Sequence, residues 1–164
     1  MPVLKLGSAL KAFASAMVIA LFSIVIFTAS AQATHLQHWV RISGSMWILD
    51  SETWSSDETG TKSFGPAWRT VPLTSTYYGE GCVGGEVKGQ VRVTFPYVST
   101  TWVLATVRGL LYEGVSCSTT DLDGQGQQDV WIPLNQSRTV SFRVWNYDEG
   151  GDFIDFSVTI RNGF

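Results

Sequence analysis

Residues 154–161 read IDFSVTIR and carry the strongest structural signal in the chain. Apolar residues occupy every second position, namely Ile154, Phe156, Val158 and Ile160, and polar residues fill the positions between them. A period of two is that of a β-strand, because successive side chains of a strand point to opposite faces of its sheet. One face of this segment is therefore expected to pack on a core and the other to face water.

The same alternation recurs along the chain, and no helical spacing of apolar residues is found after the N-terminal segment. Residues 101–112, TWVLATVRGLLY, are apolar at both sets of positions, as expected of a central strand. Breaks rich in Gly, Ser, Asp and Pro separate these runs and are typical of turns. Further strands are expected at 36–48, 62–72, 91–95, 128–133 and 140–144.

These strands predict an all-β fold, a single antiparallel β-sandwich of about seven to eight strands with one disulfide. We expect immunoglobulin-like or C2-like Greek-key connections, with a closed barrel as the alternative. No linker or low-complexity stretch interrupts residues 34–164, so these residues are interpreted as one domain.

Residues 1–33 are typical of a secretory signal peptide. Lys5 and Lys11 precede or flank an uncharged run, and Ala31-Gln32-Ala33 places small residues at the expected cleavage site. Cleavage after Ala33 would leave a protein that is secreted, to the periplasm or the extracellular space, with no membrane attachment. The alternative is a retained anchor, because the apolar run is nearly long enough to span a bilayer.

Residues 34–164 form a mildly acidic chain of 131 residues, with 9 basic and 14 acidic side chains and a formal charge of −5. Nucleic acids and anionic membrane surfaces require clustered Lys and Arg, which this segment lacks. We therefore expect no nucleic-acid partner, and we expect a monomer.

Cys82 and Cys117 are the two cysteines, and outside the cytosol such a pair usually forms a disulfide. The bond would close a ring of 36 residues and stabilise the fold by roughly 3–4 kcal/mol in the chain-entropy model. A reactive thiol, the alternative, needs a nearby base. The histidines, His35 and His38, lie at the start of the domain, far from either cysteine in sequence.

Acidic residues gather in three connections, within residues 50–58, 121–129 and 148–152. If the strands run alternately up and down, the loops at 116–127 and 147–152 share one end of the domain. The same counting places the loop at 51–61 at the opposite end, unless one short strand is miscounted or a Greek-key crossover intervenes. Acidic loops that converge would repel one another unless a cation lay between them.

Residues 120–129, TDLDGQGQQD, partly match a calcium-binding loop, because Asp121 and Asp123 take its first and third positions and Gly126 takes its turn position. The closing glutamate is missing, since Ile132 takes its place. A β-sandwich can instead build a Ca²⁺ site from several loops, because Ca²⁺ accepts 6–8 oxygen ligands in loose geometry. The predicted ligands are Asp121, Asp123, Asp148 and Asp152; the alternative is that these side chains support turns in solvent.

Tryptophan is abundant, with seven in residues 34–164. Alternation places Trp47, Trp145 and Tyr147 opposite the core face, where they would bind a glycan or an extracellular protein. Trp102 and Trp131 are assigned to the core.

Enzymatic interpretations have little support in this sequence. Neither histidine belongs to a nucleophile motif, and there are too few His and Cys residues for a zinc site. Paired carboxylates acting in glycoside hydrolysis remain an alternative. We therefore expect a secreted, non-catalytic binding or structural module, either with Ca²⁺ organising its acidic loops or with an aromatic surface for a glycan or protein.

Overall fold

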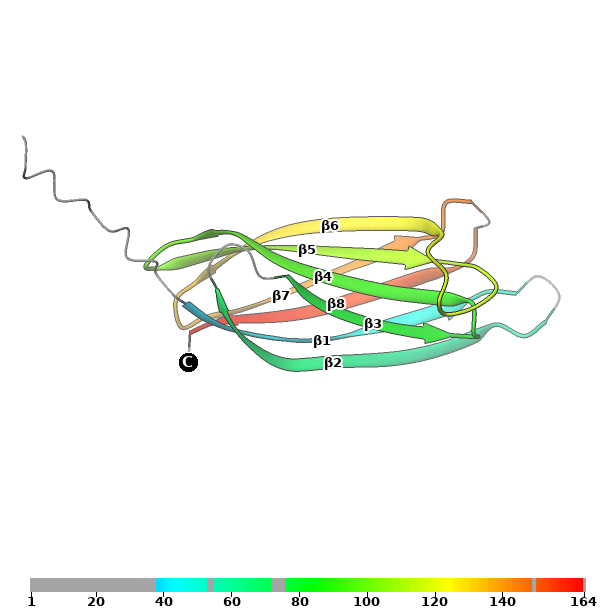
Figure 1. The fold of residues 1–164 in the computed structure, drawn as a ribbon, viewed down its shortest axis with the longest axis horizontal. Coiled ribbons are helices and arrows are strands. Elements are labelled where there is room, and N and C mark those ends of the chain that lie inside the picture. The colour runs from blue at the N-terminus through cyan, green and yellow to red at the C-terminus, as the bar shows by residue number, and fades with distance from the viewer. Residues whose placement is uncertain (1–37, 53–54, 72–75, 149, 164) are drawn as a thin grey trace, which may run out of the picture. The chain divides into compact units, whose positions relative to one another are not determined.

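Two four-stranded antiparallel sheets face each other in the computed structural model, which describes residues 38–52, 55–71, 76–148 and 150–163 (Figure 1). The expected sandwich, its number of strands and its Cys82–Cys117 disulfide are confirmed. The strands are β1 (His38–Asp50), β2 (Glu58–Val71), β3 (Tyr77–Val83), β4 (Val87–Val98), β5 (Trp102–Tyr112), β6 (Leu122–Pro133), β7 (Ser137–Trp145) and β8 (Phe153–Asn162).

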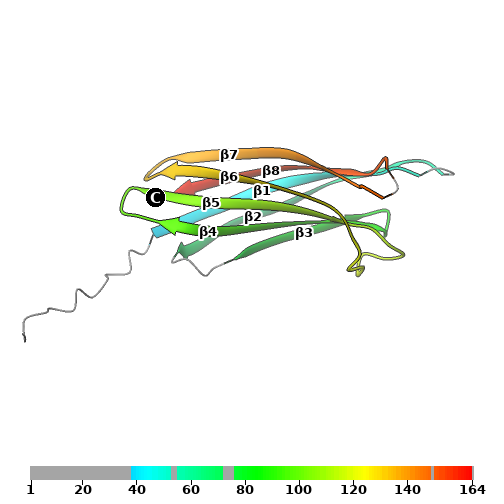
Figure 2. The ribbon, with the colours of Figure 1, turned by 90° about the horizontal axis from the view of Figure 1, so that it is seen from above.

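The strand order is β2-β1-β8-β7 in one sheet and β3-β4-β5-β6 in the other (Figure 2). Most strands that follow one another in the chain are neighbours within a sheet. The two exceptions, β2 to β3 and β6 to β7, connect the edge strand of one sheet to the edge strand of the other. The chain therefore runs up and down around the sandwich in sequence order. The expectation of Greek-key connections is wrong, because the eight described strands follow this up-and-down order. The barrel alternative has the same cyclic order, but β2 and β3, and likewise β6 and β7, are not hydrogen-bonded partners.

The core lies between the sheets and follows from the alternation in the sequence. Every second residue of β8 and of β5 is buried there. The largest fully buried side chains are Phe95, Phe156, Ile42, Met46, Ile48, Leu110, Leu111, Ile132, Ile154, Ile160 and Val40. Burial of each such side chain contributes about 1.5–3 kcal/mol. Within the described residues, none of these fully buried side chains is a tryptophan.

The segment that matched a calcium loop is a strand, because residues from Leu122 onward belong to β6 and Gly126 pairs with Gly109 of β5. Its glycines have a packing role instead. A Cβ atom on Gly124 would clash with the carbonyl oxygen of Trp145 in β7. Glycine therefore allows the edge strands of the two sheets to approach closely where they are not hydrogen-bonded to each other.

All four connections that join odd-numbered strands to the following even-numbered strands lie at one end of the sandwich, at the right of Figure 1. These are the β1–β2, β3–β4, β5–β6 and β7–β8 connections, and the disulfide joins β3 to the β5–β6 connection. The expectation that the loop at 51–61 lies at the opposite end is wrong. No strand was expected between residues 72 and 91, where β3 lies, and one missed strand reverses every end assigned before it.

The proposed signal peptide, residues 1–33, lies outside the described residues. Within the described part of the chain, no helix is long and apolar enough to cross a membrane.

Candidate functional site

Every tryptophan that the structure describes is at the surface, with exposed fractions between 36% and 50%. Tryptophan is usually among the more deeply buried residues, so this distribution is unusual for a domain with an intact core. The assignment of Trp102 and Trp131 to the core is wrong, since 43% and 50% of their surfaces are exposed. Both lie on the outer face of their sheet, because the inner positions of β5 are filled by smaller residues such as Val103 and Ala105.

The outer face of the β2-β1-β8-β7 sheet is lined largely by small hydroxyl side chains. The strand registers place four serines in one row that crosses the whole sheet: Ser63, Ser45, Ser157 and Ser141. The Ser141 hydroxyl donates a hydrogen bond of 3.4 Å to that of Ser157, and Thr139 and Thr159 are paired in the same way at 2.9 Å. Because these side chains are short, the middle of this face is a low floor.

Aromatic side chains border this floor on the side of the acidic loops. The row next to the serines holds Trp47, Asp155 and Arg143, and the row after it holds Phe153 opposite Trp145. The ring of Phe153 is 5.2 Å from that of Trp47 and 4.9 Å from that of Trp145, between ring centroids. Phe153 points away from the core but is buried beneath the two indoles, so it supports both of them.

Arg143 is fixed in place by a carboxylate and by two aromatic rings. Its Nε and Nη2 atoms donate hydrogen bonds of 2.7 Å each to the two carboxylate oxygens of Asp155. Its guanidinium carbon lies 3.6 Å from the centroid of Phe153 and 5.0 Å from that of Trp145. A bidentate pair of this kind holds donors and acceptors in a defined orientation, although both side chains are partly exposed to solvent.

Together these residues form a shallow surface groove of about 440 Å³, lined by Ser45, Trp47, Ser141, Phe142, Arg143, Asp155, Phe156 and Ser157. Trp145 adjoins the groove through Phe153 and Arg143. Tyr147 is not among the lining residues; its hydroxyl donates a hydrogen bond of 3.1 Å to the carbonyl oxygen of Gln125 in β6. The structure therefore brings together two of the three predicted aromatic residues.

The acidic end places three of the four predicted calcium ligands around a cavity of about 220 Å³, lined by Glu113, Gly114, Asp121, Asp123 and Asp148. The Asp123 carboxylate accepts a hydrogen bond of 2.8 Å from the backbone N–H of Glu113. Over the described residues, however, no group of three or more His, Cys, Asp or Glu side chains is arranged to hold a metal ion. The cavity thus collects negative charge without presenting a finished coordination site.

Asp152, the fourth predicted ligand, does not line this cavity. Its carboxylate accepts hydrogen bonds from the backbone N–H of Ser51 at 2.7 Å and from Nδ2 of Asn146 at 3.4 Å. Nδ2 of Asn146 also donates to a carboxylate oxygen of Glu113. These contacts tie the β1–β2, β5–β6 and β7–β8 connections together, so the described contacts of Asp152 are structural.

Several surface residues were missed by sequence reasoning. Phe153, Arg143 and Asp155 become part of a site only through the pairing of β8 with β1 and β7, and no local pattern signals that pairing. A second groove, of about 700 Å³, is lined by Tyr97, Ser99, Thr100, Thr101, Trp102 and Trp131 on the other sheet. Alternation could have placed Trp131 opposite Val130 and Ile132, but it assigns no face to Trp102, because 101–112 is apolar at both sets of positions.

Comparisons of this chain with protein-family models, curated proteins and solved structures gave no match. A β-sandwich supports many unrelated activities, so the fold alone selects none of them. The function is therefore inferred from the geometry of the two outer faces and the acidic end.

Proposed function

We propose that this protein is a secreted, non-catalytic binding module that holds neutral carbohydrate chains on the outer face of the β2-β1-β8-β7 sheet. One observation carries the proposal: Trp47 and Trp145 flank Phe153 beside a fixed Arg143–Asp155 pair, at the edge of a serine-lined floor. Secretion is supported by the character of residues 1–33 and by the disulfide, a bond typical of oxidising compartments.

The chemistry of this face suits sugars. A sugar ring has C–H-rich faces that pack on an indole, and it has hydroxyl groups around its edge. Arg143 offers donors, Asp155 offers acceptors, and each serine hydroxyl can donate or accept. Binding sites commonly combine apolar and aromatic surface with a few placed polar groups, which is the composition found here.

The shape of the face favours a chain over a single sugar. Successive rows of a sheet are about 7 Å apart along the strands, and the hydroxyl-lined rows continue from Ser141 to Thr139. At the far side of these rows, Trp68 pairs with Arg41, whose guanidinium lies 5.9 Å from the indole centroid. An extended ligand would therefore meet aromatic surface at both ends of a polar floor.

Hydrolysis of the bound chain is not part of the proposal. Glycosidases of the usual kind need two carboxyl groups flanking the bond that is cleaved. Among the residues described as lining the groove, Asp155 is the one carboxylate, and both of its oxygens accept hydrogen bonds from Arg143. This arrangement supports binding without catalysis.

Titration calorimetry of the oxidised protein with neutral hexasaccharides of glucose, xylose and mannose tests the proposal. Trp145→Ala is expected to weaken binding at least tenfold, a loss of about 1.4 kcal/mol, because truncated aromatic contacts dominate such surfaces. Tyr78→Ala is the matched control, since Tyr78 is an exposed aromatic residue outside both grooves. Absence of binding to every hexasaccharide, or the same number of sites with the same affinities in the two variants, contradicts the proposal and would favour a protein partner.

A second proposal concerns Ca²⁺ at the acidic end, which is supported by the cavity that Glu113, Asp121, Asp123 and Asp148 share. Ca²⁺ would add to the carboxylates already gathered there and draw the β5–β6 and β7–β8 connections together. We expect millimolar CaCl₂ to raise the melting temperature relative to EDTA, because a ligand of the folded state stabilises it by mass action. The rise should vanish in Asp121→Asn/Asp123→Asn; equal melting temperatures of the parent with and without Ca²⁺ would end this proposal.

A further inference from the structure

The groove on the opposite sheet combines aromatic and hydroxyl side chains in the same way as the first groove. Tyr97 and Trp131 lie on either side of Leu104, with their ring centroids 5.4 Å apart. Each of the three aromatic residues in this groove is more than 40% exposed. The other lining residues are Ser99, Thr100 and Thr101. None of the described lining residues is charged.

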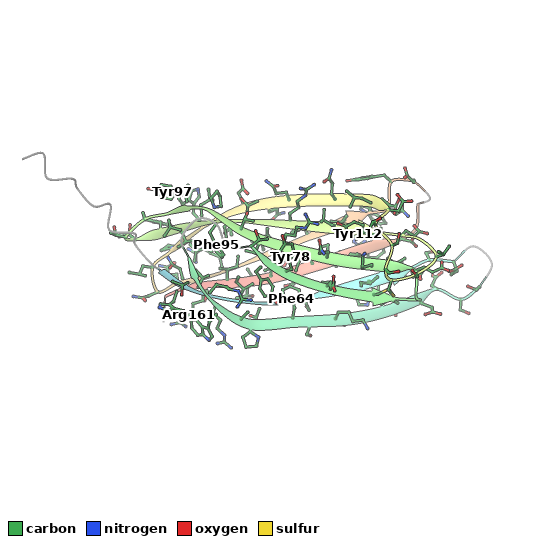
Figure 3. All side chains as sticks on the ribbon, viewed as in Figure 1. Phe64, Tyr78, Phe95, Tyr97, Tyr112 and Arg161 are labelled. Atoms are coloured by element: carbon green, nitrogen blue, oxygen red, sulfur yellow. A yellow bond between two sulfur atoms is a disulfide. The ribbon has the colours of Figure 1, made fainter. Side chains whose placement is uncertain are left out.

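A β-bulge turns Tyr97 toward this groove. In β4, Val91, Val93 and Phe95 are buried, so alternation alone would bury Tyr97 as well. The register shifts between Thr94 and Tyr97, where β4 carries one more residue than β5, and Pro96 lies within the shift. Tyr97 therefore points outward while Phe95 remains in the core (Figure 3). Bulges often redirect a side chain in this way beside functional sites.

The turn that closes the groove is firmly held. The Ser99 hydroxyl accepts hydrogen bonds from the backbone N–H groups of Thr101 and Trp102, at 3.3 and 3.0 Å. The backbone N–H of Leu134 donates a bond of 2.7 Å to the carbonyl oxygen of Thr101. These bonds fix Trp102 on one side of the groove, so little order has to be imposed when a ligand binds.

We infer that this groove, formed by Tyr97, Trp102 and Trp131, is a second binding site for neutral carbohydrate, which makes the domain bivalent. The inference rests on the proposed function for the class of ligand. Uncharged hydroxyls beside open aromatic faces suit a neutral sugar, whereas nothing in the described lining would pair with a charged one. Because the two grooves lie on opposite sheets, one molecule would bind two separate chains and cross-link them.

The test counts sites and measures cross-linking with the full oxidised protein. Calorimetry with the tightest-binding hexasaccharide should give two sites for the parent and one each for Trp131→Ala and Trp145→Ala. The parent should also cross-link the matching soluble polysaccharide, as measured by turbidity. The turbidity should be at least tenfold lower for Trp131→Ala and for Trp145→Ala than for the parent, and it should be unchanged for Tyr78→Ala. Trp102→Ala serves as a second variant, and the melting temperature of each protein confirms that it is folded.

The possible outcomes separate this inference from the proposed function. If Trp131→Ala and Trp102→Ala leave the number of sites and the turbidity unchanged while Trp145→Ala removes binding, the second site is refuted and the first stands. If Trp131→Ala abolishes all binding and Trp145→Ala has no effect, bivalency is refuted and the binding site moves to the second groove. Two sites in the parent, each removed by its own variant, establish the bivalent domain.

Discussion

Asp50 is the residue whose environment differs most from that of an ordinary surface carboxylate. It ends β1 with 4% of its surface exposed, and its carboxylate lies against the backbone of Gly84. Burial, together with the smaller effects of the charges of Asp152, Glu52, Glu86 and Glu58, raises its pKa from 3.8 to about 6. Desolvation and like charges both disfavour the ionised form, so Asp50 is ionised at neutral pH at the expense of stability.

The sign of the pH dependence follows from this raised pKa. Between pH 4 and pH 6 the folded state binds more protons at Asp50 than the unfolded state, so the free energy of unfolding falls as pH rises. Asp50→Asn should remove this component and raise the melting temperature at pH 7 more than at pH 4. Each kcal/mol corresponds to about 3–5 °C for a domain of this size.

The matched control for this prediction is Asp129→Asn, which removes one negative charge from an exposed position of β6. Its melting temperature should differ little from that of the parent at either pH value, because it retains Asp50. Thermal melts at pH 4 and pH 7 compare the three proteins. A gain for Asp50→Asn that is the same at both pH values would show that the burial of the charge is not its cause.

Single residues also show where sequence reasoning succeeds and where it does not. Alternation correctly placed Trp47 and Trp145 on an outer face, because β1 and β7 have one clearly apolar face each. The same reasoning failed for Trp102, because 101–112 is apolar at both sets of positions and either face could be the inner one. The outward position of Tyr97 was also not predictable, because it depends on a bulge. A bulge adds one residue to a strand and shifts the alternation after it, but the apolar and polar residues themselves do not mark where it occurs.

At the scale of elements, the strands with regular alternation were predicted closely and the glycine-rich strands were not. The predicted strands at 36–48 and 62–72 correspond to β1 and β2, which are displaced by only a few residues. β3 was missed, and β6 was predicted only at 128–133. YYGEGCV and LDGQGQ carry glycines where alternation would need apolar residues, because those glycines meet side chains or backbone of the facing edge strand.

This packing role makes Gly124 intolerant of a side chain. Gly124→Ala places a methyl group against the carbonyl oxygen of Trp145, which can move only if β6 and β7 separate. The hydrogen bond of 2.9 Å from the Tyr147 backbone N–H to the Asp123 carbonyl resists that separation. We expect a loss of about 1–3 kcal/mol in the free energy of unfolding, the usual cost of overpacking, measured by urea denaturation.

Gly126→Ala is the matched variant, on the same strand and the same side. Its methyl group would lie 3.2 Å from a Val144 side-chain carbon and 3.3 Å from the Phe142 ring, and side chains yield more easily than backbone. Removing a glycine also restricts the unfolded chain, which adds about 0.4–1 kcal/mol of stability. The Gly126 variant should therefore remain within about 1 kcal/mol of the parent, and equal losses at both positions would rule out backbone contact as the cause.

For the molecule as a whole, the up-and-down order of the strands has an electrostatic consequence. It gathers at one end acidic residues that the sequence distributes over three connections, and the β3–β4 connection adds Glu86. Sequence reasoning found the acidic clusters but could not show that they converge, since convergence depends on the exact number of strands. Lys88, at the start of β4, lies at the same end, where its ammonium contacts the Thr119 carbonyl and the Tyr112 ring.

Repulsion within this end should make the stability of the protein depend on salt. Raising NaCl from 10 mM to 1 M shortens the screening length from about 30 Å to about 3 Å, so the melting temperature at pH 7 should rise. Glu52→Gln/Glu86→Gln should raise the melting temperature at low salt and reduce its dependence on NaCl, because the charges of both acids raise the pKa of Asp50. Glu80→Gln/Asp129→Asn changes the net charge equally but at mid-strand positions of β3 and β6, and it should leave most of the dependence intact. If the two double variants behave alike, net charge and not its concentration at one end of the sandwich governs the stability.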